Sequence, residues 1–113
     1  YSLAVVDWQS ISLGCAFNDV SYFMGTSLSP DDRANNEEAL LKLYLDVLKS
    51  YGIEMKWDNC WAMYRHFAPA GLIMAVIASM IVGETDRGND MFMAMATRSS
   101  QMSEDLQSLA VLK

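Results

Sequence analysis

Two aspartates in the first part of the chain are the side chains whose type and setting could do chemistry. Asp7 follows a short apolar run and precedes Trp8 and Gln9. A carboxylate at the exposed end of a hydrophobic strand can bind a Mg²⁺ ion that bridges nucleotide phosphates, or it can simply end the strand and cap a turn. Asp19 comes at the expected start of a buried helix, where a carboxylate can bind backbone N–H groups and hold a neighbouring loop. We therefore expect a structural role for Asp19 and a metal-ligand or strand-end role for Asp7.

The element that must position Asp7 is a strand over residues 1–8, which is apolar and contains β-branched valines. A loop over residues 9–17 follows, and then a short helix that Asn18 or Asp19 can cap. A single strand cannot form a sheet by itself. We expect it to pair within a hairpin, with a neighbouring copy, or with further sequence.

The next segment carries a strong helix start. Ser29 can accept hydrogen bonds from free backbone N–H groups, and Pro30 suits the first helical position. Apolar residues then recur at helical spacing to about Tyr51, and Gly52 is suited to end the helix. The sequence predicts a long helix between these signals.

The remaining chain predicts further helices. Asp58 can cap a third helix, and Pro69 must break it because proline lacks the N–H that a helix interior needs. Residues 70–82 are apolar on every face, which is typical of the central helix of a bundle. Asn89 or Asp90 can cap a last helix. The predicted fold is mainly α: a short N-terminal strand or hairpin followed by a four- to five-helix bundle.

Composition limits the classes of function. The 113 residues predict a single domain, residues 1–113, and 52% of them are hydrophobic while 19% are charged. Either the core is unusually rich, or apolar surface is covered by a partner or by further sequence, and we favour the second. The net charge of −6 disfavours partners such as nucleic acid or an anionic membrane surface.

Cysteine usage and the apolar stretch bear on location. Cys15 and Cys60 do not form a Cys-x-x-Cys pair, and we expect both to be small buried hydrophobes in a reducing, cytoplasmic setting. Residues 67–83 are uncharged, but they include Pro69 and Gly71. We expect a buried helix there rather than a membrane span.

Two motifs and two helical stretches suggest a family. The motifs are Val5-Val6-Asp7-Trp8-Gln9 and Phe17-Asn18-Asp19-Val20-Ser21-Tyr22-Phe23, and the stretches are Cys60–Arg65 and Ala70–Ala75. Over nearly its whole length the chain resembles the C-terminal lobe of the aminoglycoside phosphotransferase and choline-kinase-like family of protein-kinase-like phosphotransferases. It looks closest to the bacterial branch known only as phosphotransferases.

The resemblance implies roles for several residues. Asp7 matches the family's Mg²⁺ ligand, and Asp19 its structural helix-start aspartate. Trp61, Tyr64 and Arg65 become candidate acceptor-pocket residues, although such aromatics more often belong to a core. The intact enzyme would use Mg-ATP.

The chain departs from the family pattern in its catalytic parts. The family's His-Gly-Asp…Asn loop and its nucleotide-binding lobe with a lysine lie upstream of the Asp-Trp strand, and nothing in these residues matches them. His66 is the only histidine, and we expect it to be structural. Positioning nucleotide, metal and acceptor together is what phosphoryl transfer requires. We therefore expect no catalytic residue and no bound cofactor in this chain alone.

Two functions follow as hypotheses. In the first, the chain is the C-terminal lobe fragment of an ATP-dependent kinase that phosphorylates a hydroxyl of a small molecule, inactive without its N-terminal lobe. In the second, it is a stand-alone helical module that binds a partner or forms a homodimer. The acceptor stays open among sugars, aminoglycosides, choline-like and lipid-like alcohols.

Overall fold

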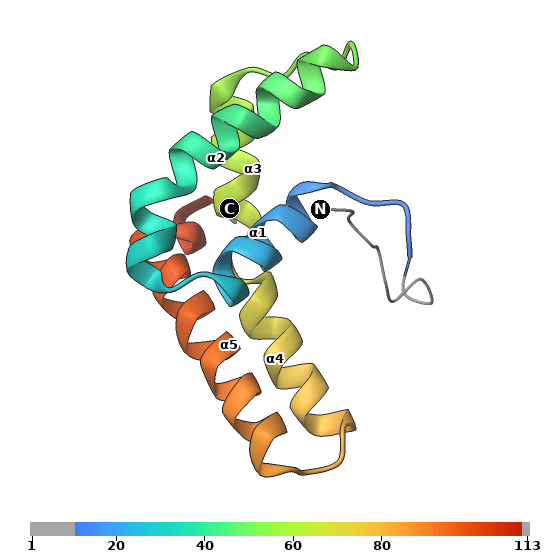
Figure 1. Ribbon diagram of the computed structural model, residues 1–113, viewed down its shortest axis with the longest axis vertical. Helices are drawn as coiled ribbons and strands as arrows, with labels where there is room; N and C mark the ends of the chain where they lie inside the picture. Colours follow the sequence, from blue (N-terminus) through green and yellow to red (C-terminus); the bar gives the residue numbers. More distant parts are fainter. Residues whose placement is uncertain (1–10, 112–113) are drawn as a thin grey trace, which may run out of the picture.

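The structure, a computed structural model, describes residues 11–111, so the predicted strand over residues 1–8 and Asp7 lie outside it. Within that range the chain is helical, as predicted, and contains no strand (Figure 1). The elements are α1 (Phe17–Ser27), α2 (Pro30–Ser50), α3 (Trp57–Phe67), α4 (Ala70–Ile81), α5 (Asp86–Asp105) and the 3-10 helix η2 (Ser108–Val111). Residues 11–15 are irregular chain, so the second strand of the expected hairpin does not form there.

The helices surround α1 rather than α4. Figure 1 shows α4 and α5 as a hairpin on one side of α1, with α2 and α3 extending to the other. Backbone carbonyls of α1 bind side chains of α5: Ser99 Oγ donates to Gly25 at 3.3 Å, and Arg98 Nη1 donates to Thr26 at 3.0 Å. Ser21 Oγ of α1 donates to the Tyr64 carbonyl of α3 at 3.0 Å. Helix α1, which carries the Phe17–Phe23 motif, is thus the element that joins the half formed by α4 and α5 to the half formed by α2 and α3.

The start of α2 is the one that the sequence predicts. Ser29 caps the helix, since its Oγ accepts a hydrogen bond from the Asp32 backbone N–H at 3.1 Å, and Pro30 is the first helical residue. Tyr51 is the C-cap, and Gly52 follows with a φ of 79°. That conformation favours glycine, which explains why the helix ends there.

Three other helices begin earlier than predicted. The N-caps are Ala16 for α1, Lys56 for α3 and Thr85 for α5, in place of Asn18 or Asp19, Asp58, and Asn89 or Asp90. Only Thr85 provides a side-chain cap, accepting from the Gly88 N–H at 3.0 Å. Asp19, Asp58 and Asp86 instead occupy the first turns of these helices, where a negative charge favours the helix dipole. The acidic side chains therefore predicted approximately where these helices begin, but they did not identify the N-cap residues.

The apolar core lies where α1, α2, α3 and α5 meet. Its buried members include Phe17, Leu41, Cys60 and Met102. The Phe17 ring packs edge-on against Tyr44 with ring centroids 5.7 Å apart. Cys60 is buried as expected, but Cys15 is exposed in the irregular segment before α1, which corrects the prediction that both thiols are buried.

Helix α4 is not the buried centre of the bundle that its composition predicts. Its buried residues are the small Gly71 and Ala75, whereas its large side chains point outward. Met80 is 82% exposed and Ile81 78% exposed. When a helix is apolar on every face, its sequence does not show which face points inward. Here α4 approaches α5 closely, and only its smallest side chains fit on the face between the two helices.

One stretch of the described residues, Trp57–Ile81, is long and apolar enough to cross a membrane by length and composition, with a mean hydropathy of 1.3 in its best window. Core helices of soluble proteins can have the same length and composition. Pro69 divides the stretch into α3 and α4.

We predict that Gly71→Ala destabilises the protein. A Cβ at this position would lie 2.2 Å from Ser99 Oγ and 2.7 Å from Thr26 Cγ2, so α4 would have to move away from α1 and α5. Overpacking of this kind costs about 1–3 kcal/mol, which urea unfolding followed by circular dichroism would measure. Gly83→Ala is the matched control, because no atom lies within 4 Å of its Cβ. Equal stability of the two variants would contradict the packing described here.

Candidate functional site

A buried polar cluster joins three helices near the core. Arg33 of α2 is only 1% exposed, and its Nη1 lies 2.6 Å from Glu37 Oε2 on the same helix. Its Nη2 forms a salt bridge with Asp105 of α5, and Gln101 Nε2 donates to Asp105 Oδ1 at 2.9 Å. Tyr64 of α3 donates its hydroxyl to Glu37 Oε2 at 2.9 Å. The cluster therefore links α2 to α5 through the Arg33 guanidinium, and α2 to α3 through the Glu37 carboxylate.

The electrostatics of the cluster favour the protonated forms of Arg33 and Tyr64. Burial acts to lower the pKa of Arg33, but the hydrogen bond and charge of Glu37, with Asp105, raise the pKa above its ordinary value. Burial, and then the negative charge of Glu37, raises the pKa of the Tyr64 hydroxyl well above its ordinary value. Both groups thus stay protonated at neutral pH, and the cluster is built to hold helices together rather than to exchange protons.

The predicted acceptor-pocket residues lie beside this cluster. Tyr64 is fully buried, whereas Trp61 is partly exposed and stacks on Trp57 with ring centroids 5.6 Å apart. Lys42 Nζ lies 5.1 Å above the Trp57 ring. Arg65 points elsewhere: its Nε donates to the Leu106 carbonyl at 2.7 Å, at the end of α5. Of the three predicted residues, Trp61 is the one that combines a large aromatic face with partial exposure and stacking on a second indole.

The best candidate for a ligand site is a hollow at the start of α1. Asn18 and Tyr22 lie one helical turn apart on α1, and His66 of α3 faces the same hollow, whose volume is about 380 Å³. Ile73 and Met74 of α4 are part of its apolar lining. An amide, a phenol and an imidazole above an apolar wall can bind a small molecule that has both polar and apolar parts.

Asp19 lies at the edge of two further hollows. One, of about 250 Å³, is formed by the irregular segment before α1 together with Asn18 and Phe67. The other, of about 370 Å³, lies between α1 and α2 and is otherwise apolar, with Phe23 and Tyr44 in its lining. Asp19 is exposed, in the first turn of α1. Its carboxylate is thus open to solvent near the segment that leads to Asp7.

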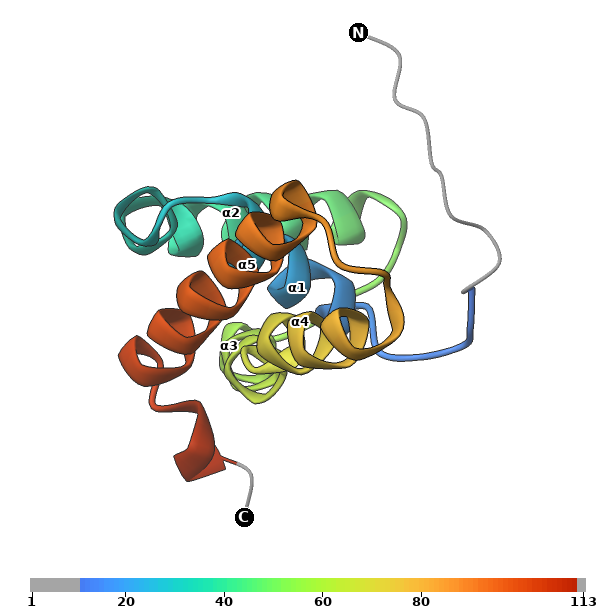
Figure 2. The ribbon, with the colours of Figure 1, turned by 90° about the horizontal axis from the view of Figure 1, so that it is seen from below.

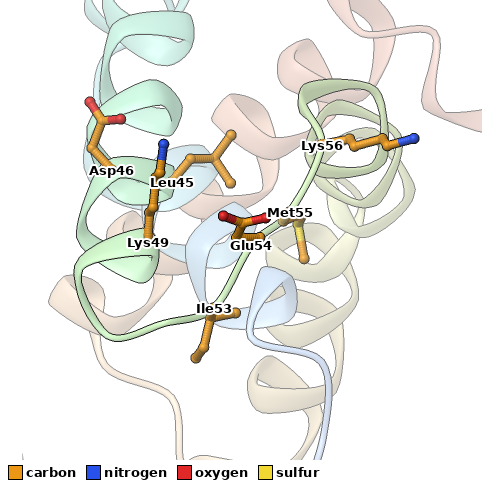
Figure 3. A pocket seen from close by; sticks show the side chains of 7 residues that line it. All are labelled: Leu45, Asp46, Lys49, Ile53, Glu54, Met55 and Lys56. Carbon is orange, nitrogen blue, oxygen red and sulfur yellow. The ribbon is translucent and has the colours of Figure 1, made fainter.

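A further hollow lies elsewhere, at the far end of α2. Figure 3 shows Asp46 and Lys49 on α2 and Glu54 in the loop before α3, with the Asp46 and Lys56 side chains pointing away from Glu54. Its volume is about 510 Å³. Charges of both signs line an open surface there, and none of the residues with a predicted role is among them.

The described residues give no support of their own to the predicted Mg²⁺ site. No group of three or more His, Cys, Asp or Glu side chains that could hold a metal ion occurs within residues 11–111. The predicted metal ligand, Asp7, lies outside that range, so its role stays a prediction.

Comparison with known proteins assigns the chain to a family. The described part is an all-α domain with a polar hollow at the start of its central helix. Residues 1–109 match the family described as "Uncharacterized oxidoreductase dhs-27", and the chain belongs to that family. This family lies in the kinase-like, choline-kinase-like group, which agrees with the broader resemblance noted from the two Asp motifs. No curated protein and no solved structure gives a significant match.

Sequence reasoning missed the buried cluster. The only local signal was the spacing of Arg33 and Glu37, which places them one helical turn apart as an ion pair. Tyr64 and Asp105 come from other helices, and nothing in the sequence shows that they meet Arg33. The cluster became visible only with the fold.

We predict that Tyr64→Phe changes how stability depends on pH. The hydrogen bond to Glu37 contributes roughly 1–3 kcal/mol at neutral pH, so the variant is less stable. In the unfolded chain the tyrosine ionises near pH 10, but in the folded protein its raised pKa keeps it protonated. The free energy of unfolding of the native protein therefore falls as pH rises above about 10, and the variant lacks this contribution.

Urea unfolding from pH 8 to 11 measures this difference. We expect the difference in free energy of unfolding between the native protein and Tyr64→Phe to become smaller as pH rises. Tyr51→Phe is the control, because Tyr51 is exposed and should leave both stability and its pH dependence unchanged. If this difference stays constant over the whole pH range, the Tyr64 hydroxyl is not buried and bound to Glu37 as described.

Proposed function

We propose that this chain forms the helical C-terminal lobe of a kinase-like phosphotransferase of the aminoglycoside phosphotransferase and choline-kinase-like type. The observation that carries the proposal is the family match over residues 1–109, in a kinase-like group, together with the Asp7 and Asp19 motifs. The helical architecture of residues 11–111 is consistent with it. The intact enzyme would transfer phosphate from Mg-ATP to a hydroxyl of a small molecule.

In this proposal the residues divide into three roles. Asp7 holds Mg²⁺, and Asp19, in the first turn of α1, orders the segment between the two aspartates. The acceptor lies toward the hollow at the start of α1 or toward the exposed face of Trp61. Tyr64 and Arg65 support that region from inside, since one binds Glu37 and the other binds the end of α5.

The groups that would activate the acceptor are not among these residues. The 113 residues contain no His-x-Asp-x-x-x-x-Asn segment, and their one histidine, His66, lies on α3. Phosphoryl transfer needs the nucleotide, the metal and the acceptor to be held together. We therefore propose that the chain works with an N-terminal lobe and is inactive by itself.

The family description names an oxidoreductase, which is a different chemistry. Nicotinamide-dependent oxidoreductases commonly bind the dinucleotide with a Gly-x-Gly-x-x-Gly turn between a strand and a helix. The 113 residues contain no such motif. The residues of this chain thus favour the kinase-like proposal over a dinucleotide-binding one.

A second candidate is a helical interaction module without catalysis. It is favoured by the outward-facing large apolar side chains of α4, which a soluble monomer would rarely leave uncovered. The two candidates are compatible, since a lobe can also associate through such a surface. A cytoplasmic location would suit either.

We predict that the 113-residue chain alone neither hydrolyses ATP nor transfers its phosphate. Isothermal titration calorimetry with Mg-ATP should show no micromolar binding, and a coupled ADP assay with hydroxyl acceptors should show no turnover. Micromolar binding that disappears in Asp7→Asn would contradict the view that the chain is inactive alone.

The same assays on a longer protein that includes the sequence before Tyr1 should show activity. We expect the coding sequence before Tyr1 to encode a His-x-Asp-x-x-x-x-Asn segment, and the protein that includes it to consume ATP. Asp7→Asn should then lower kcat on the order of 10²–10³-fold, as loss of a charge-stabilising group does. Asp46→Asn, in the hollow of Figure 3, is the matched control and should leave kcat unchanged. An unrelated upstream sequence, or full activity in Asp7→Asn, would overturn the proposal.

A further inference from the structure

The outer face of α4 is a continuous apolar strip. Ile73, Val76, Ile77 and Met80 follow the i, i+3, i+4, i+7 spacing that places side chains on one side of a helix, and Met74 lies beside them. All five are exposed, from 46% for Ile77 to 82% for Met80. In Figure 2 α1 and α5 lie on one side of α4, and no other described helix covers the opposite side.

The strip has a hollow at one end and a projecting side chain at the other. Ile73 and Met74 belong to the lining of the hollow of about 380 Å³ at the start of α1. Met80, the most exposed side chain of the strip, lies two helical turns further on. A two-fold axis through the middle of the strip would place the projecting side chain of each copy opposite the hollow of the other copy.

We propose that α4 pairs antiparallel with α4 of a second copy of this chain, with the two-fold axis passing close to Val76 and Ile77. Residues 73 and 80 are equally far from that axis in the sequence. Met80 of each copy therefore enters the hollow beside Ile73 of the partner, twice in the dimer.

The charges around the strip also suit this arrangement. No charged residue occurs from residue 67 to residue 83, so α4 itself places no charged side chain between two strips that meet. The exposed Glu84 and Asp86 follow the end of α4, and antiparallel pairing brings them near the positive N-terminal end of the partner's α4. The same acidic residues, with the net charge of −6, disfavour an anionic membrane as the occupant.

The extent of the strip predicts a reversible dimer. Standard interfaces bury about 800 Å² on each partner, and the largest apolar patch on an ordinary monomer is about 300–600 Å². An interface formed mainly by the five exposed side chains of one helical face uses fewer residues than the roughly 20–30 a side of a standard interface. We therefore expect the association to depend on concentration, and not to be needed for folding.

Sedimentation equilibrium of the 113-residue chain over a range of concentrations is the test. We expect a monomer–dimer equilibrium whose dissociation constant rises about tenfold or more in Ile77→Glu, because two like charges meet near the axis. Leu43→Glu, an equally drastic change at an exposed site of α2, is the control and should not alter association. Circular dichroism of both variants should match the native protein.

A charge pair tests the orientation. Ile73→Glu alone and Met80→Lys alone should each weaken the dimer, and the double variant should regain it, because residue 73 faces residue 80 of the partner. In a parallel pair residue 73 would face itself, and the double variant would be worse than either single one.

Three results would overturn this inference. They are a native chain that is monomeric at all concentrations, a dimer insensitive to Ile77→Glu, and a monomer that binds phosphatidylcholine vesicles through the strip. The inference extends the interaction-module candidate. Because Met80 of the second copy would fill the hollow at the start of α1, the dimer leaves the exposed face of Trp61 as the acceptor position of the phosphotransferase proposal, which turnover tests separately.

Discussion

The guanidinium of Arg33 is the group on which the rest of the fold depends. It is buried, it lies between carboxylates from α2 and α5, and one of those carboxylates also accepts the hydroxyl of Tyr64 from α3. A buried charge is tolerated only when it is paired and hydrogen-bonded, so these helices must keep their relative positions. Within residues 11–111 the buried Arg33 Nε has no hydrogen-bond partner, so the side chain is held by the contacts of its two terminal nitrogens.

This constraint explains how the two halves of the molecule differ. On the side of α2 and α3, large apolar and aromatic residues fill the core and the polar cluster fixes the angles between helices. On the side of α4, the contacts with α1 and α5 are made by small residues such as Gly71, Ala75 and Ser99. The large residues of α4 are left outside, where they form a surface suited to association. Both halves contribute side chains to the hollow at the start of α1, which is one of the two proposed acceptor positions.

The local features of the fold could be predicted from the sequence, and the long-range ones could not. Ser29 and Pro30 gave the start of α2, and Pro69 gave the break between α3 and α4, because each acts on its own backbone. The orientation of α4 could not be predicted, since Ala70–Ile81 has no polar face to show which side points inward. At the candidate site the sequence pointed to Trp61, Tyr64 and Asp19, but the meeting of Asn18 and Tyr22 with His66 depends on how α1 crosses α3.

The central claim is that the Arg33 cluster acts as a unit that holds α2 against α5. A double-mutant cycle with Arg33→Met and Asp105→Asn, followed by urea unfolding, tests it most directly. We expect each single change to lower the free energy of unfolding, Arg33→Met by about 3–5 kcal/mol because Glu37 is left buried without its cation. The two effects should not add, with an interaction energy of about 1–3 kcal/mol. Additive effects, or an Arg33→Met variant as stable as the native protein, would contradict the account.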